Sequence, residues 1–135
     1  MDISEKDGLR LTTGRLRLCS LRQADLPELL AIGGQVRVAQ MFHSVPHPWT
    51  AAHCAGWIAQ AAWTGAIPFR VGVFLPDGRL IGTVGVVGPP VSIGYFIDAG
   101  HTGQGYAAEA AHAVLDFLFR HFAPDFVQAE HFDDN

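Results

Sequence analysis

The residues best suited to chemistry are glycines in a short loop. Residues 101–110 read HTGQGYAAEA, after a predicted strand (92–97) and at the start of the longest predicted helix (106–122). Because glycine has no Cβ, an anion can approach the backbone of Gly103 and Gly105 closely. The first N–H groups of a helix have no partner within it, and the helix dipole favours negative charge there. The spacing therefore predicts a cradle for a diphosphate.

The same glycines also fit the GxGxxA form that is typical of dinucleotide-binding folds, with Glu130 as a candidate ribose-binding acid. Two features disfavour this interpretation. Residues 98–102 separate the strand from Gly103, whereas the glycines of a Rossmann turn follow their strand closely. Only five residues follow Glu130, too few for a doubly wound sheet. We therefore expect a phosphorylated ligand on a different fold.

The hydrophobic pattern predicts the order β-α-α-α-β-β-β-α-β. The expected strands are 15–21, 69–75, 80–87, 92–97 and 126–131, and the expected helices are 23–32, 36–42, 51–62 and 106–122. Thr50 is a suitable N-cap, and residues 76–79 (PDGR) form a hairpin turn. The predicted class is α+β, with antiparallel strands followed by one strand-helix-strand crossover in a single domain, residues 1–135.

Composition excludes several kinds of protein. With 49% hydrophobic and 16% charged residues, the 135-residue chain is typical of a globular domain. A net charge of −4 disfavours nucleic-acid binding, which needs a basic face. The sequence has no apolar run of about 18 residues that could span a membrane and no signal peptide, so we expect a cytoplasmic location.

Cysteine and histidine spacing gives no metal or disulfide framework. Cys19 and Cys54 lack CxxC spacing, so both are expected to be small buried side chains. The histidines include no HExxH pattern and no paired short-spacing set. We therefore expect no metal site, and a structural role for Glu109 in the first turn of the long helix.

Several stretches together resemble the GNAT superfamily, in the branch of ribosomal-protein alanine and related N-acetyltransferases. The similar stretches are 13–18 with 21–25, 78–82, 93–97, 101–110 and 128–135. The most specific part is 93–110. The resemblance implies a mixed, mostly antiparallel twisted sheet flanked by helices, and acetyl transfer from acetyl-coenzyme A (acetyl-CoA) to a primary amine by direct attack.

Site residues follow from the resemblance position by position. Those implied to hold the coenzyme pyrophosphate through backbone amides are Gly103, Gln104, Gly105, Tyr106 and Ala107. The backbone of Phe96 and Ile97 is implied to pair with the pantetheine arm, and Asn135 is implied to contact the coenzyme. The acceptor remains open among a protein N-terminus, an amino acid, a polyamine and an antibiotic.

The general base is less defined. It must remove a proton from an ammonium group near neutral pH, which suits histidine. Glu130 and His131 lie at the strand end expected to face the acyl slot, so they are the candidates. A water chain or a residue outside this sequence is an equal alternative.

Four aromatic residues are expected to combine core packing with one wall of the acceptor site: Phe42, Trp49, Trp57 and Trp63.

Two positions depart from the family pattern. The motif often begins with Gln or Arg three residues before the first glycine, where this chain has Gly100. In similar sequences the residue matching Asn135 precedes a further helix and two strands, and that helix supplies the acid that protonates the thiolate. We therefore expect a shortened form with an open strand edge, or a homodimer that covers it.

The alternative function is a non-catalytic acyl-CoA-binding or interaction module.

Overall fold

The computed structural model describes residues 8–34 and 49–129. The strands are β1 (Arg10–Thr12), β2 (Arg17–Ser20), β3 (Phe69–Phe74), β4 (Leu80–Val87), β5 (Ser92–Ile97) and β6 (Gln128–Ala129). The α-helices are α1 (Leu26–Gly33), α3 (Ala51–Gln60) and α4 (Tyr106–His121), and 3-10 turns span Gln23–Asp25 and Ala99–His101.

The predicted elements are confirmed within these ranges, and β1 is an additional strand. The predicted helix 36–42 lies outside the described residues.

The strands form one six-stranded sheet in the order β1-β2-β3-β4-β5-β6. Each pair of neighbours is antiparallel except β5 and β6, which are parallel, with Ser92 opposite Gln128. Helix α4 connects these two parallel strands, as a parallel pair requires. The predicted α+β class with one crossover is thus confirmed, and a doubly wound parallel sheet is excluded for the described residues.

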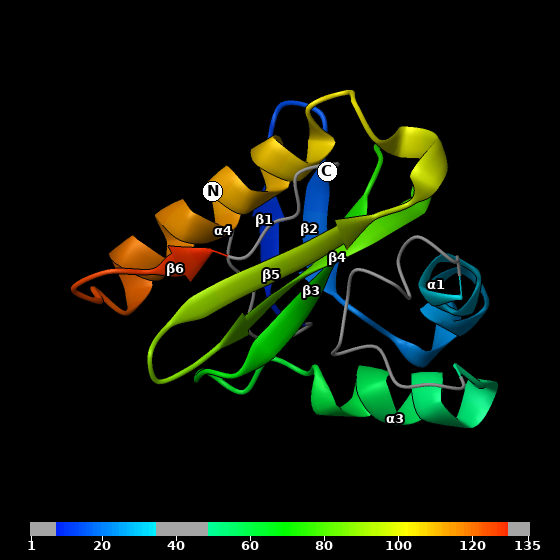
Figure 1. Cartoon of the computed structure of the whole chain (residues 1–135), viewed down its shortest axis with the longest axis horizontal. Coiled ribbons are helices and arrows are strands. Elements are labelled where there is room, and N and C mark those ends of the chain that lie inside the picture. The colour runs from blue at the N-terminus through cyan, green and yellow to red at the C-terminus, as the bar shows by residue number, and fades with distance from the viewer. Residues whose placement is uncertain (1–7, 35–48, 130–135) are drawn as a thin grey trace.

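Helices cover both faces of the sheet (Figure 1). On one face, α4 contributes Ala110, Val114, Phe117 and Leu118 to the larger core, at helical spacing. On the other face, α1 and α3 pack together over a smaller core that includes Phe96 of β5. Strand β5 therefore has a different layer on each side, and its two faces present separate sites.

Local signals in the sequence account for the element ends. The Thr50 hydroxyl accepts a hydrogen bond of 3.2 Å from the His53 N–H, which confirms the predicted N-cap of α3. In the hairpin turn, Gly78 has φ +93°, and its N–H donates to the Leu75 carbonyl at 2.9 Å. The Asp77 carboxylate accepts from the Arg79 N–H at 2.9 Å. These contacts fix the register of β3 against β4.

The two cysteines differ in environment. Cys54 is fully buried, as predicted, and burial raises the pKa of its thiol. Cys19 is half-buried instead, because β2 exposes that part of its surface, so this prediction was wrong in degree. Within the described residues, no helix is long and apolar enough to cross a membrane.

Candidate active site

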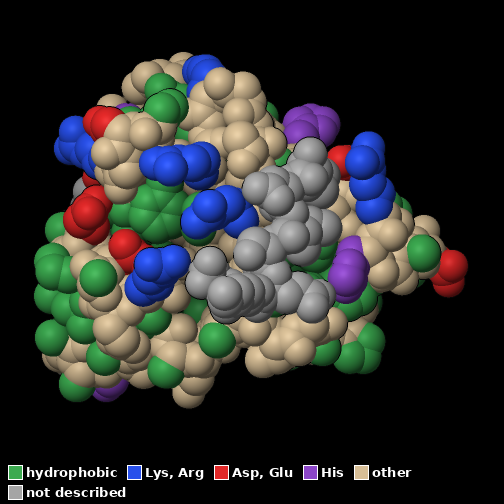
Figure 2. Space-filling view, turned by 180° about the vertical axis from the view of Figure 1, so that it is seen from behind, with side chains coloured by type: hydrophobic (Ala, Val, Ile, Leu, Met, Phe, Trp, Pro, Cys, Tyr) green, Lys and Arg blue, Asp and Glu red, His purple; other side chains and the backbone are tan. Residues whose placement is uncertain are grey.

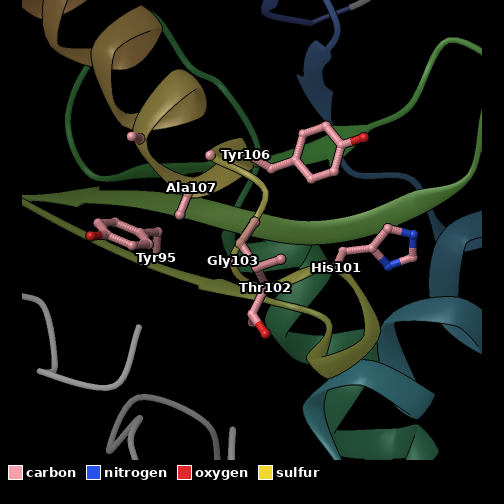
Figure 3. Close-up of a pocket in the computed structure, with 9 residues that line it drawn as sticks. Tyr95, His101, Thr102, Gly103, Tyr106 and Ala107 are labelled. Atoms are coloured by element: carbon pink, nitrogen blue, oxygen red, sulfur yellow. The ribbon is translucent and has the colours of Figure 1, made fainter.

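A pocket of about 170 Å³ lies where β5 leads into α4 (Figure 3). Tyr95 and Ile97 come from β5, and residues 106–108 come from the first turn of α4. The connecting loop contributes His101, Thr102, Gly103 and Gly105. Five residues predicted to bind the coenzyme thus line one cavity: Ile97, Gly103, Gly105, Tyr106 and Ala107. The pocket is on the α4 side of the sheet.

The two loop glycines have backbone conformations that other residues rarely adopt. Gly103 has φ +77° and Gly105 has φ +81°, both in the left-handed region. A Cβ on Gly103 would meet no atom within 4 Å, and one on Gly105 would lie 3.4 Å from Nη2 of Arg15. The backbone angle by itself therefore favours glycine at both positions.

The first turn of α4 supplies hydrogen-bond donors to this pocket. The helical ladder begins where the Glu109 N–H donates to the Gly105 carbonyl at 3.0 Å. The N–H groups of Tyr106, Ala107 and Ala108 precede that bond, and no side chain caps the helix. All three residues line the pocket, at the positive end of the helix dipole. The arrangement suits a bound anion such as a phosphate.

A 3-10 turn, Ala99–His101, occupies the lead-in between β5 and the glycines. His101 Nδ1 lies 2.7 Å from Oδ2 of Asp98, and the His101 N–H donates to the Asp98 carbonyl at 2.9 Å. The Asp98 N–H in turn donates to the Ile81 carbonyl on β4. This pair anchors the glycine loop to the sheet. Sequence reasoning did not identify it, although the i, i+3 spacing of Asp98 and His101 was a usable signal.

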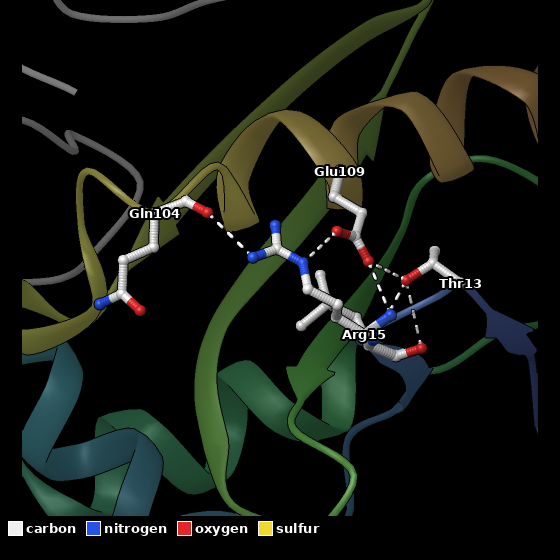
Figure 4. A network of polar contacts seen from close by, with 5 residues as sticks. Thr13, Arg15, Gln104 and Glu109 are labelled. Atoms are coloured by element: carbon white, nitrogen blue, oxygen red, sulfur yellow. Dashed lines mark hydrogen bonds and ion pairs between the residues drawn. The ribbon is translucent and has the colours of Figure 1, made fainter.

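Glu109 connects α4 to the N-terminal segment (Figure 4). Its carboxylate accepts from the Thr13 hydroxyl, from the Arg15 N–H at 3.0 Å and from Arg15 Nε at 2.7 Å. Arg15 Nη1 donates to the Gln104 carbonyl at 3.0 Å, and its guanidinium lies 4.4 Å from the Tyr106 ring centroid. The structural role expected for Glu109 is confirmed, because it holds Arg15, which in turn contacts the glycine loop. Gln104 contributes its backbone carbonyl alone, and its side chain points away from the network in Figure 4.

The charge of Glu109 is stabilised by its donors. Partial burial alone would raise the pKa of its carboxyl, but the hydrogen bonds from Thr13 and Arg15 and the positive charge of Arg15 outweigh burial. The net result is a pKa below the ordinary value. Glu109 is therefore ionised at neutral pH, as a support for the loop and not as a proton donor. No local pattern in the sequence identifies Arg15 as its partner.

The remaining predicted residues fall into two groups. Phe96 points away from the pocket and is buried in the core under α1 and α3, whereas its neighbour Ile97 lines the pocket. The predicted pairing of their backbone with pantetheine is untested. The candidate bases Glu130 and His131 and the predicted coenzyme contact Asn135 lie outside the described residues, as does Phe42.

The aromatic residues expected near the acceptor site are divided between the two faces. Trp49 and Trp57 pack edge to face, with centroids 5.8 Å apart, and Trp57 lies 6.2 Å from Phe96. Trp63 instead packs against Phe69 in the core under α4, at 4.8 Å. The grouping of Trp63 with the other two was therefore wrong, because the chain crosses to the other layer after α3.

The glycine loop, crossover and sheet order together match one family. Residues 15–135 match the model of the acetyltransferase (GNAT) domain. The chain belongs to the GNAT acetyltransferase family. This is a family of acetyltransferases, so the match supports acetyl transfer as the general activity.

Solved structures share this GNAT fold. An acetyltransferase from Agrobacterium tumefaciens has 26% identity and a TM-score of 0.73, over 94% of this chain and 73% of that one. A GNAT acetyltransferase from Bacillus anthracis has 18% identity and a TM-score of 0.79, over 94% and 76%. A ribosomal-protein-S5-alanine acetyltransferase from Vibrio fischeri has 15% identity and a TM-score of 0.71, over 90% and 73%. No functionally curated protein has a significantly similar sequence.

Proposed function

We propose that this protein transfers the acetyl group of acetyl-CoA to a primary amine. The observation that carries the proposal is the set of three helix-start N–H groups that line the pocket beside two left-handed glycines. Such donors suit a diphosphate, and the diphosphate of the coenzyme joins its nucleotide to its pantetheine arm. The residues proposed to hold it are Gly103, Gln104, Gly105, Tyr106 and Ala107.

The two faces of the sheet are proposed to bind different reactants. The pocket for the diphosphate is on the α4 face, and Ile97 at the end of β5 lines it. Phe96 of β5 and Trp57 of α3 pack together on the opposite face. We place the pantetheine arm along β5, through the backbone of Phe96 and Ile97, and the amine on the α1 and α3 face. The amine then meets the thioester beside Phe96 and Ile97, beyond the part of β5 that pairs with β6.

Acetyl-CoA supplies an activated thioester: the amine nitrogen forms a bond to the acetyl carbon, the carbon–sulfur bond breaks, and the proton lost by the nitrogen balances the one gained by the thiolate. The chain's part is to hold both reactants and move these protons. Glu130 and His131 remain the proposed candidates for the base. Asn135 remains a proposed coenzyme contact.

The acceptor class remains a primary amine of a small molecule or a peptide. One solved structure with this fold is named as an acetyltransferase of ribosomal-protein alanine, which supports keeping a protein amine among the candidates. The cytoplasmic location expected from the sequence suits such acceptors and remains a prediction.

Two measurements test the proposal. Acetyl-CoA and CoA should raise the melting temperature of the purified protein, whereas NAD should not, because the mostly antiparallel sheet offers no dinucleotide crevice. Release of free thiol from acetyl-CoA should then depend on an added amine in a panel of amino acids, N-terminal peptides, polyamines and aminoglycosides. Stabilisation by acetyl-CoA without thiol release would favour the non-catalytic binding module. Stabilisation by NAD alone would overturn both.

A further inference from the structure

Arg70 is a half-buried cation on the sheet face covered by α1 and α3. Its guanidinium lies over the Trp57 ring of α3, 4.2 Å from the centroid, and Nη1 donates to the Thr83 hydroxyl at 3.3 Å. Thr83 itself is fully buried. The guanidinium is thus fixed between an aromatic plane and the sheet, with its orientation set from two sides.

Gly85 makes room for this guanidinium. Arg70 and Gly85 are register partners on β3 and β4, and a Cβ on Gly85 would come 2.5 Å from Cζ of Arg70. Gly85 in turn pairs with Gly94 of β5. The arginine therefore lies flat across the sheet, toward β5. Adjacent strands are about 4.8 Å apart, so the guanidinium is about one strand away from Gly94, which lies two residues before Phe96 on the strand proposed to bind pantetheine.

The charge of Arg70 has no carboxylate partner among the described residues. Its side chain makes the contacts to Trp57 and Thr83, and no acidic group of residues 8–34 or 49–129 is within ion-pair distance. Burial lowers its pKa to about 10, so it still carries its charge at neutral pH. A cation removed from water is costly unless an anion offsets it. An anionic ligand bound at Arg70 would offset this cost.

The other described arginines have a different environment. Six of them are exposed: Arg10, Arg15, Arg17, Arg22, Arg79 and Arg120. Figure 2 shows basic side chains of this kind at the surface, several with acidic neighbours. Within the described residues, Arg70 is the arginine that combines burial with the absence of an acidic partner. This environment therefore distinguishes Arg70, on the face covered by α1 and α3, from the arginines at the surface.

A pocket of about 210 Å³ includes Arg70 in its wall. Its lining also includes Trp57 and Gln60 of α3 and Val86 and Val87 at the end of β4. The pocket is separate from the one at the start of α4, because the two have no lining residue in common. It combines apolar walls with one fixed cation, which is the composition expected of a small-ligand site.

From this geometry we infer that Arg70 recognises a carboxylate on the acceptor, and that the preferred substrates are amines carrying a carboxylate a few bonds from the reacting nitrogen. A guanidinium fork pairs with a carboxylate through two parallel hydrogen bonds. With the carboxylate on Arg70, an amine a few bonds away extends from Gly94 along β5 toward Phe96. This inference rests on the proposed acetyl transfer and adds the substrate class to it.

The carboxylate has two sources, which matched acceptor pairs distinguish. One pair is a free amino acid and its amide. The other is an amidated peptide with Glu at its second position and the same peptide with Gln. In at least one pair, the wild-type kcat/KM for the acid should exceed that for the neutral partner at least tenfold, equivalent to about 1.4 kcal/mol. The acid of the first pair identifies an amino-acid substrate, and that of the second a peptide N-terminus.

Arg70 variants assign this preference to the guanidinium. Arg70→Gln should reduce the ratio between acid and neutral acceptor to within about twofold, mainly through KM for the acid. Arg70→Lys should keep part of the preference, because it keeps the charge but loses the fork. Arg79→Gln removes an exposed arginine from the hairpin turn and should leave the ratio unchanged. An unchanged affinity for acetyl-CoA shows that each variant is folded.

The results separate the two proposals. Turnover of amines without an acid preference, or a preference that persists in Arg70→Gln, would overturn the role of Arg70 and leave the acetyl transfer standing. Absence of turnover with every amine would overturn the acetyl transfer. In that case the CoA-loaded protein still tests Arg70, because a carboxylate binding there should change the tryptophan fluorescence with the acid of at least one pair and not with its neutral partner. Equal fluorescence changes within both pairs would reject the site.

Discussion

The Arg15 guanidinium and the Glu109 carboxylate lie 2.7 Å apart and join positions 94 residues apart in the sequence. Arg15 also donates to the Gln104 carbonyl in the glycine loop. One ion pair thus connects the entry to β2, the loop and the first turn of α4. The loop keeps its shape because its backbone is held from outside as well as by its own glycines.

Replacing Glu109 with Gln should loosen this connection. The variant removes the negative charge that orients Arg15, so we expect a several-fold loss of acetyl-CoA affinity by calorimetry. Because the Arg15 side chain is 48% exposed, the free energy of unfolding should fall by only about 0.5–1 kcal/mol in urea. Asp116→Asn is the matched control, since Asp116 pairs with Arg120 elsewhere on α4. Equal affinity losses in both variants would show that Glu109 has no specific role in the loop.

The same carboxylate predicts a pH dependence. The pKa of Glu109 is lower in the folded protein than its ordinary value of 4.5, so the folded state favours the ionised form. Its contribution to stability is complete above about pH 4.5 and is lost as the pH falls through the lower folded value. The difference in unfolding free energy between wild type and Glu109→Gln should therefore be constant at neutral pH and shrink in acid. A difference that grows below pH 4 would contradict this assignment.

The N-cap of α3 gives a prediction about stability alone. Thr50→Ala removes the oxygen that accepts from the His53 N–H, and should lower the free energy of unfolding by about 1 kcal/mol. Thr50→Ser keeps that oxygen and should be close to wild type. Because the cap lies away from the pocket at the start of α4, acetyl-CoA affinity should not change. Denaturant unfolding and calorimetry test the two parts, and a stable Thr50→Ala variant would mean that the cap bond is weak.

Much of the fold could be predicted because the sequence marks it locally. The hairpin turn at residues 76–79, the Thr50 cap and the helical spacing in α4 all depend on near neighbours. Strand β1 was missed, because three residues carry too short an alternating pattern. Trp63 was misplaced because hydrophobicity alone does not tell which face of a sheet an aromatic residue joins.

The candidate site divides in the same way. The glycine loop was predictable, since phosphate binding at a helix start needs glycines and free N–H groups that are consecutive in sequence. The support for it was not, because Arg15 and Glu109 are brought together by packing over a long separation. Arg70 was missed for the same reason: its meaning depends on Gly85 across the sheet and Trp57 on another element.

The left-handed conformation of Gly105 leads to the most direct test of the coenzyme pocket. In Gly105→Val, a β-branched residue would have to adopt φ +81°, at a cost of about 1–3 kcal/mol, and its Cβ would lie 3.4 Å from Nη2 of Arg15. The loop should shift and draw the N–H groups of the first turn of α4 away from the diphosphate. We expect acetyl-CoA to bind at least tenfold more weakly, a loss of at least about 1.4 kcal/mol.

Gly65→Val is the matched control for that test. Gly65 also has a left-handed conformation, φ +89°, and a Cβ there would meet no atom within 4 Å. It lies between α3 and β3, outside the pocket at the start of α4. Both variants should lose stability through the same backbone strain, but only Gly105→Val should lose acetyl-CoA affinity. If a folded Gly105→Val binds acetyl-CoA as tightly as Gly65→Val does, the diphosphate binds elsewhere and the proposed cradle is wrong.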